Sequence, residues 1–161
     1  MNTNLQNVNV QDLQQLKETS CSERFKAIYR DFNHKTIASL DTIYADNVIF
    51  EDPISRIQGV GALKSHFEST LNGLVHCSFV FDKEFNAHAS YCYEWRMNFA
   101  HEKIRSGEDL ILHGSSVVVF NENGKVVSHR DYYDMGEMLY ENIPVLGSIV
   151  RFIKQKLSPK P

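Results

Sequence analysis

The sequence predicts a single α+β domain in which N-terminal helices pack on a strongly curved antiparallel sheet. Two patterns support this fold class. Apolar residues recur at helical spacing over the first half of the chain, whereas from residue 74 onward the chain has the texture of strands. Helices that precede a run of strands are typical of α+β proteins. The 161 residues are the length of one domain and suffice to bury a sizeable core.

Composition excludes several classes of function. The 17 basic and 20 acidic residues give a net charge of −3, so no nucleic-acid partner is expected. Residues 1–20 lack the features of a secretory signal and are expected to form a mobile arm of a cytoplasmic protein. Cys21, Cys77 and Cys92 lack metal-ligand spacing, and no glycine-rich phosphate loop is present, so neither a metal nor a cofactor is expected.

Three helices are expected before residue 74. The first covers about residues 22–33, and the second begins at Thr36, whose side chain is expected to cap it. A short strand follows and is ended by Pro53, and the third helix then runs to near Gly73. The buried stripes of the first two helices are Phe25, Ile28, Tyr29, Phe32, Ile37, Leu40, Ile43 and Tyr44.

Four strands are expected in the second half, over residues 74–88, 89–102, 110–120 and 125–134. A hairpin turn at 121–124 joins the last two, because its Asn-Gly pair adopts positive φ readily. The period of two along 89–102 places Tyr93, Trp95 and Met97 on one face and Glu94 and Arg96 on the other.

The ring-bearing face is expected to look toward the helices and to line a pocket. Tyr93, Trp95 and Met97 are therefore candidate substrate-binding residues. Ser116 belongs to the inward set of the next strand, together with Gly114, which removes a side chain where the sheet bends or where a ligand approaches.

Candidate acid–base chemistry comes from two segments. His129, Asp131 and Tyr133 share one face of the last strand, and a histidine beside a buried carboxylate is a plausible acid–base pair. The alternative is a structural pair whose hydrogen bonds are satisfied internally, or a face turned to solvent. Asp52 stands among apolar neighbours just before Pro53, where it is either a general base or a residue that initiates a turn.

The order of elements resembles that of the SnoaL-like, nuclear-transport-factor-two-like superfamily, which includes ketosteroid isomerases. The strongest matches are YADNVIFEDP (44–53) and FNENGKVVSHRDYYD (120–134), within a resemblance that covers about residues 22–135. The resemblance implies a cone with an internal apolar pocket, a small apolar organic ligand and a homodimer formed through the convex face of the sheet. It is poorly specific for activity, because this fold hosts isomerases, cyclases, dehydratases, epoxide hydrolases and binders that are not enzymes.

The resemblance also implies roles for individual residues. Asp52 stands at the position of the isomerase general base, and Asp131 is similar in location to an acid–base aspartate of SnoaL-type cyclases. The two oxyanion donors of the isomerase do not carry over, because Ile28 and Ser116 stand at their positions, so steroid isomerisation is not expected. Acid–base catalysis by an isomerase, cyclase or lyase and ligand binding without catalysis use the same residues, and the sequence does not distinguish them.

The domain is expected to span residues 21–135, and a helical extension to follow over 136–161. Residues 142–157 carry an apolar stripe with Arg151, Lys154 and Lys156 on or near the opposite face. Such a stripe requires burial, and packing within the chain or between subunits is expected before peripheral contact with a membrane, which is the alternative.

Overall fold

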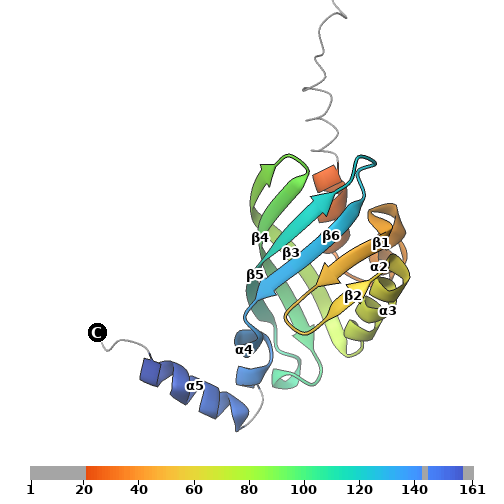
Figure 1. Ribbon diagram of the computed structural model, residues 1–161. Helices are drawn as coiled ribbons and strands as arrows, with labels where there is room; N and C mark the ends of the chain where they lie inside the picture. Colours follow the sequence, from red (N-terminus) through yellow and green to blue (C-terminus); the bar gives the residue numbers. More distant parts are fainter. Residues whose placement is uncertain (1–20, 143–144, 158–161) are drawn as a thin grey trace, which may run out of the picture.

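The computed structural model describes residues 21–142 and 145–157, and within them six strands form one open, mixed sheet. The strand order is β2-β1-β6-β5-β4-β3, and the sheet curves around the helices that cover its inner face (Figure 1). This confirms the α+β class. The bounds are β1 (Tyr44–Glu51), β2 (Arg56–Gln58), β3 (Leu74–Ala87), β4 (Ser90–His101), β5 (Leu110–Phe120) and β6 (Val126–Tyr133).

The helices that precede β3 differ from the expectation at one point. Residues 21–30 are helical, and α2 (His34–Ala38) follows after Asn33, whose side chain accepts hydrogen bonds from two backbone N–H groups of α2. Thr36 is not the cap, because its hydroxyl instead bonds back to Asn33 as the second half of a capping box. The expected second helix is thus wrong in extent, since a 3-10 turn, η1 (Leu40–Thr42), follows and Tyr44 already begins β1.

The four strands expected after residue 74 pair antiparallel in chain order, as predicted, whereas β1, which precedes them, pairs with β6 in parallel. Phe50 pairs with His129 and Glu51 with Arg130, so the register continued by one residue places Asp52 level with Asp131. Neighbouring strands lie about 5 Å apart. Two carboxylates that are far apart in sequence therefore reach the same end of the sheet.

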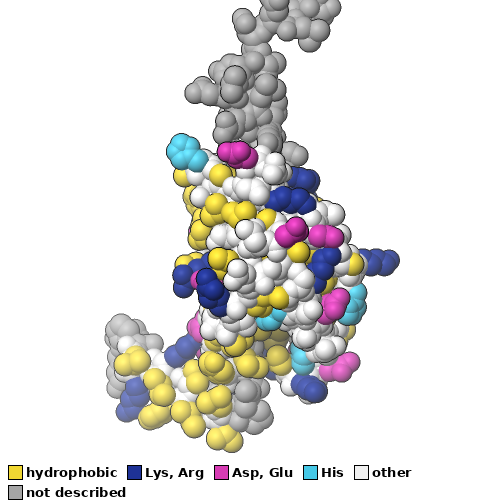
Figure 2. Space-filling view, turned by 45° about the vertical axis from the view of Figure 1, so that its right-hand side comes forward, with side chains coloured by type: hydrophobic (Ala, Val, Ile, Leu, Met, Phe, Trp, Pro, Cys, Tyr) yellow, Lys and Arg dark blue, Asp and Glu magenta, His cyan; other side chains and the backbone are white. Residues whose placement is uncertain are grey.

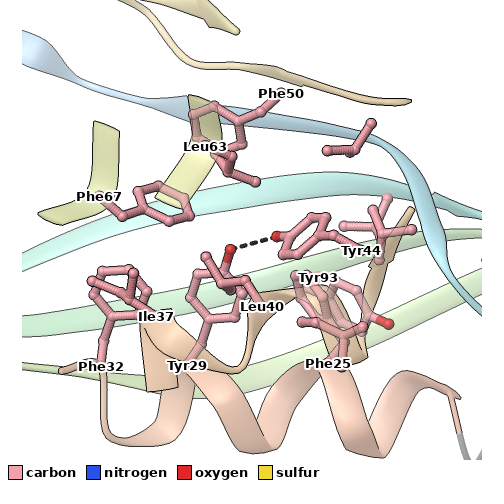
Figure 3. Close-up of a cluster of buried hydrophobic side chains, with 14 of the residues drawn as sticks. Phe25, Tyr29, Phe32, Ile37, Leu40, Tyr44, Phe50, Leu63, Phe67 and Tyr93 are labelled. Carbon is pink, nitrogen blue, oxygen red and sulfur yellow. Dashed lines mark hydrogen bonds between the residues drawn. The ribbon is translucent and has the colours of Figure 1, made fainter. Parts of the chain in front are cut away.

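Rings fill the space between the sheet and the helices. Phe25, in the helix over residues 21–30, stacks on Tyr93 of β4 with 5.2 Å between ring centroids. Figure 3 shows the cluster around Phe25, with Leu40 and Leu63 packed beside the rings. The third expected helix is α3 (Val60–Thr70), which contributes Leu63 and Phe67 to this core.

The expected faces of β4 are confirmed. Tyr93 and Trp95 are buried, whereas Glu94 and Arg96 lie on the outer face, where they pair with Lys83 and with Asp82 of β3. The outer face of the sheet also carries exposed apolar side chains, namely Val80, Ile111, Val117 and Tyr132. A homodimer through this face stays a prediction.

Gly114 has a definite packing role. It pairs directly with Trp95 across β4 and β5, and a Cβ at Gly114 would lie 2.3 Å from the indole ring. The ring therefore lies over the glycine backbone. The absent side chain makes room for the indole.

The end of the chain forms α4 (Met135–Met138), η3 (Tyr140–Asn142) and α5 (Leu146–Leu157). In Figure 1, α5 projects sideways from one end of the domain. Its apolar stripe is exposed and does not pack within the chain, so of the two expected burials only packing between subunits stays a prediction. No described helix is long and apolar enough to cross a membrane. The arm expected at residues 1–20 lies outside the described residues.

Candidate active site

A chain of hydrogen bonds runs through the interior of the domain and converges on Asp131. On one side, the indole Nε1 of Trp95 donates to Ser116 Oγ at 2.8 Å. The Ser116 hydroxyl donates in turn to Oδ1 of Asp131 at 2.5 Å. Ser116 is buried, so its hydroxyl is committed to these two partners.

On the other side, His129 connects the carboxylate to two buried tyrosines. His129 Nε2 lies 2.8 Å from Asp131 Oδ1, and its Nδ1 lies 2.7 Å from the Tyr44 hydroxyl. The Tyr44 hydroxyl lies 2.5 Å from that of Tyr29. Figure 3 marks this hydrogen bond with a dashed line. His129 is only 1% exposed, so both of its ring nitrogens are satisfied inside the protein.

One assignment of hydrogens satisfies every member of this chain. An ionised Asp131 only accepts, so His129 carries its hydrogen on Nε2 and accepts on Nδ1 from Tyr44, which accepts from Tyr29. Burial, reinforced by the nearby charge of Asp131, raises the pKa of Tyr29 well above its ordinary value. Burial likewise raises the pKa of Tyr44, so both hydroxyls keep their hydrogens at neutral pH. All the donors therefore point toward a single carboxylate oxygen.

The second oxygen of Asp131 is free to meet a ligand. Among the described residues, Oδ2 has no hydrogen-bond partner, and the side chain lines a cavity of about 190 Å³. The wall of this cavity is mostly apolar and aromatic, with contributions from β1, α3, β3, β4 and β6. Trp95 and Met97 lie in that wall, as do Phe50, Phe67 and Phe79.

Asp52 reaches the same cavity and also shapes a turn. Its Oδ1 accepts the backbone N–H groups of Ile54 and Ser55 at 2.8 and 2.6 Å, which is the turn that its place before Pro53 suggests. Its Oδ2 lies 3.9 Å from Nε2 of His66, which also lines the cavity. The two interpretations of Asp52 are compatible, because each concerns a different oxygen.

Tyr133 interacts with both carboxylates, and its hydroxyl hydrogen-bonds to Asp52. Burial raises the pKa of its hydroxyl, and the charges of Asp52 and Asp131 raise it further. The hydroxyl therefore stays protonated at neutral pH and can donate a hydrogen bond. The cavity thus combines two carboxylates and the Tyr133 phenol with two histidines, His66 and His101, in a wall that is mostly apolar.

Some predicted site residues line the cavity and others do not. Trp95, Met97, Tyr133, Asp52 and Asp131 line it. His129 and Ser116 lie behind Asp131 and hold it, and Tyr93 donates to Ser22 Oγ at 3.0 Å, away from the cavity wall. The roles of all these residues stay predictions.

Sequence reasoning did not select Tyr29, Tyr44 or His66. Tyr29 and Tyr44 were recognised only as members of apolar stripes, although an inward tyrosine needs a partner for its hydroxyl, and this signal was available. No motif in the sequence marks His66, and only the folded chain places it beside Asp52. No cluster of three or more metal-ligating side chains occurs in the part of the chain that the structure describes.

These features define a small α+β protein with a mostly apolar cavity into which two carboxylates project. The family model of the SnoaL-like domain matches residues 25–129, so the chain belongs to this family. Among curated proteins, none matches the chain.

Solved structures share the fold at low sequence identity. A protein of ketosteroid isomerase-like fold from Catenulispora acidiphila, in complex with trimethylamine, is 14% identical with a TM-score of 0.65, and the match covers 76% of this chain and 91% of that one. An LEH-like epoxide hydrolase from M. tuberculosis is 14% identical with a TM-score of 0.63, over 84% and 96% of the two chains. An NTF2-like protein of unknown function from Burkholderia pseudomallei is 14% identical with a TM-score of 0.65, over 76% and 95%. At such identities the likeness shows the fold alone.

Proposed function

We propose that the protein binds a small apolar organic molecule and moves a proton on it by general acid–base catalysis, with Asp131 as the base. The observation that carries this proposal is the buried chain of donors that fixes Oδ1 of Asp131 and leaves Oδ2 in the cavity. Fixed donors hold a carboxylate in one orientation, and a general base requires such an orientation toward the proton that it takes.

The size of the cavity favours a substrate with about one ring. A volume of about 190 Å³ is only slightly larger than the roughly 150 Å³ of an engineered apolar cavity that binds benzene. Drug-sized ligands occupy sites of about 300 Å³ or more. A four-ring steroid would therefore protrude through the mouth of the cavity, whereas a monocyclic ketone fits inside.

The arrangement suits proton abstraction from a carbon next to a carbonyl group. Asp131 Oδ2 takes the proton, and the electron pair of the broken C–H bond moves to the carbonyl oxygen, forming an enolate. The enolate oxygen replaces Asp52 as acceptor of the hydrogen bond from the Tyr133 hydroxyl, which is protonated and lies at the same wall. Asp131 then returns the proton to the same carbon or to another one, which gives exchange or isomerisation.

The remaining groups act through these two. His129 and Ser116 are positioning residues, since they touch Asp131 and not the cavity. Asp52 is a second candidate base, and the partly exposed His66 lies 3.9 Å from its Oδ2.

Hydrogen–deuterium exchange tests this proposal without knowledge of the natural product. A panel of monocyclic ketones is incubated with the protein in deuterated buffer, and loss of the α-proton signal is followed by NMR. We expect Asp131→Asn to lower the catalysed rate by roughly a hundredfold or more and Tyr133→Phe by a comparable factor. Glu94→Gln, on the outer face of β4, is the matched control and should leave the rate unchanged. A full rate in Asp131→Asn would contradict the assignment.

Ligand binding without catalysis is the second candidate. It is favoured by the complete internal satisfaction of His129, which is what a purely structural histidine–carboxylate pair requires. The same assay distinguishes the two, because a binder would take up the ketones and protect them without exchanging their protons.

A further inference from the structure

A groove of about 670 Å³ adjoins the cavity of Asp131 and has more than three times its volume. One part of its wall is formed by the β4–β5 connection and the start of β5, and another part by α4, η3 and α5. Figure 1 shows these segments next to one another at one end of the domain. The proposed chemistry makes no use of this outer groove.

Three side chains belong to the walls of both the outer groove and the cavity. They are Phe99, Leu112 and Met138. Phe99 and Leu112 are only 3% and 0% exposed, so packing fixes them, whereas Met138 of α4 is partly buried. A methionine side chain is unbranched and adapts its shape readily. Met138 is therefore the part of the shared wall that can move aside for a flexible chain.

The wall of the outer groove differs in chemistry from that of the cavity. Figure 2 shows hydrophobic side chains gathered on α5 and on the neighbouring end of the domain. To its apolar side chains the wall of the groove adds five charged ones, namely Arg105, Asp109, Glu137, Glu141 and Arg151. Two positive and three negative groups almost cancel, so the groove does not favour a strongly charged ligand. Because guanidinium groups donate hydrogen bonds and carboxylates accept them, the wall suits a neutral ligand that carries both acceptors and donors.

Polar contacts hold the α5 part of this wall in place. Gly147 lies so close to the backbone of Glu141 that a Cβ there would be 2.2 Å from its carbonyl oxygen. Arg151 Nη1 donates to the same carbonyl oxygen at 2.9 Å, and Lys154 Nζ pairs with the Glu141 side chain at 2.5 Å. This polar anchor fixes α5 beside η3, so the wall is formed by the folded chain itself.

The β4–β5 connection supplies hydrogen-bond donors to the outer groove. The side chain of Arg105 is 53% exposed, and its Nε lies 3.4 Å from a carboxylate oxygen of Glu108. A guanidinium group has five N–H donors, so this contact leaves others for a ligand. Arg105 can therefore donate to an acceptor that lies in the groove.

From these observations we infer that the outer groove holds a flexible, uncharged polar chain attached to the ring in the cavity, so that the substrate is a monocyclic ketone carried on a chain of amide or hydroxyl groups. This inference rests on the proposed function, which places the ring beside Asp131. Amide and hydroxyl groups offer acceptors to the arginines and donors to the carboxylates. Rigid fused rings fit less well, because Phe99 and Leu112 are fixed by burial and only Met138 can give way.

Isothermal titration calorimetry with the full-length protein tests this inference. Cyclohexanone is compared with a derivative that carries, opposite its carbonyl group, a chain with two amide groups. We expect the derivative to bind at least about tenfold more tightly, because its amides add hydrogen bonds in the groove. Arg105→Ala should weaken binding of the derivative about fivefold and leave binding of cyclohexanone unchanged. Lys103→Ala removes a positive charge from the same connection but lines neither the groove nor the cavity, so this matched control should bind both ligands normally.

Three results would overturn the inference. They are equal affinity for the two ligands, an equal loss of affinity in Lys103→Ala, and a loss of cyclohexanone binding in Arg105→Ala that matches the loss for the derivative. Binding of neither ligand would overturn the proposed function as well. Asp131→Asn separates the two proposals, because it should still bind the derivative more tightly than cyclohexanone while it loses proton exchange. If that variant kept both the difference in binding and a full exchange rate, the chemistry alone would be contradicted.

Discussion

The Tyr44 hydroxyl is the middle member of the buried hydrogen-bond chain, and its removal has a calculable effect. It lies 2.5 Å from the Tyr29 hydroxyl and 2.7 Å from His129 Nδ1, in a side chain that is 1% exposed. Tyr44→Phe keeps the ring and its packing but leaves both neighbours without a partner. Each buried, unsatisfied polar group costs about 1–3 kcal/mol, so for the two neighbours we expect a loss of roughly 2–6 kcal/mol in the free energy of unfolding.

Tyr29→Phe should behave differently, because Tyr29 is the end of the chain. Tyr44 still donates to His129 in that variant, so the free energy of unfolding should fall by only about 1 kcal/mol, the value of one ordinary hydrogen bond. In the Tyr44→Phe background, however, Tyr29→Phe removes a hydroxyl that has already lost its partner. There it should be neutral or stabilising.

Urea unfolding of the two single variants and the double variant measures these differences, with an unchanged m-value as the check that only stability has changed. The sign of the Tyr29→Phe effect in the two backgrounds is the decisive result. If Tyr29→Phe cost the same in both, the hydroxyls would act independently and the continuous chain would be refuted.

Further predictions concern packing and alkaline stability. Gly114→Ala should lower the free energy of unfolding by about 1–3 kcal/mol and change the fluorescence of Trp95, because a Cβ at this position would overlap the indole. Gly61→Ala, in the open part of α3, is the control, and urea unfolding should show it to be neutral or stabilising. Burial raises the pKa of the Cys77 thiol to about 12 from an ordinary 9.0. The contribution of the neutral thiol to the free energy of unfolding is therefore complete below pH 9 and is lost as the pH rises toward 12. The urea midpoint of unfolding should fall over that range. A midpoint that rises with alkaline pH would contradict this sign.

The strand pattern could be predicted from the sequence because it is local. Alternation along β4 put Tyr93 and Trp95 inside and Glu94 and Arg96 outside, and the structure confirms this. The same rule put His129 on the inner face of β6.

The long-range pairings could not be predicted in the same way. β2 has only three residues, and the parallel pairing of β1 with β6 joins segments about eighty residues apart, which no local period encodes. Tyr44 continued an apolar stripe at helical spacing, so it was assigned to a helix, although its partners in the sheet make it the first residue of a strand. The position of Asp52 beside Asp131 follows from this pairing alone.

The C-terminal helix α5 shows a different limit of prediction from sequence. Its amphipathic pattern predicted a helix, and α5 is that helix. Periodicity identifies the apolar side of a helix but carries no information about what covers it. The polar anchor through Gly147 and Arg151 became visible only in the folded chain.

The central claim, that the cavity beside Asp131 holds a one-ring ligand, is tested most directly through the single tryptophan of the chain. Trp95 lines the cavity, and its indole N–H bonds to Ser116, which bonds to Asp131. Its one indole signal in a ¹⁵N NMR spectrum therefore reports on this site. We predict that a saturable shift occurs on titration with a monocyclic ketone and is absent with a four-ring steroid. Binding of the ketone without any shift of the Trp95 signal, or equal shifts with both ligands, would contradict the account.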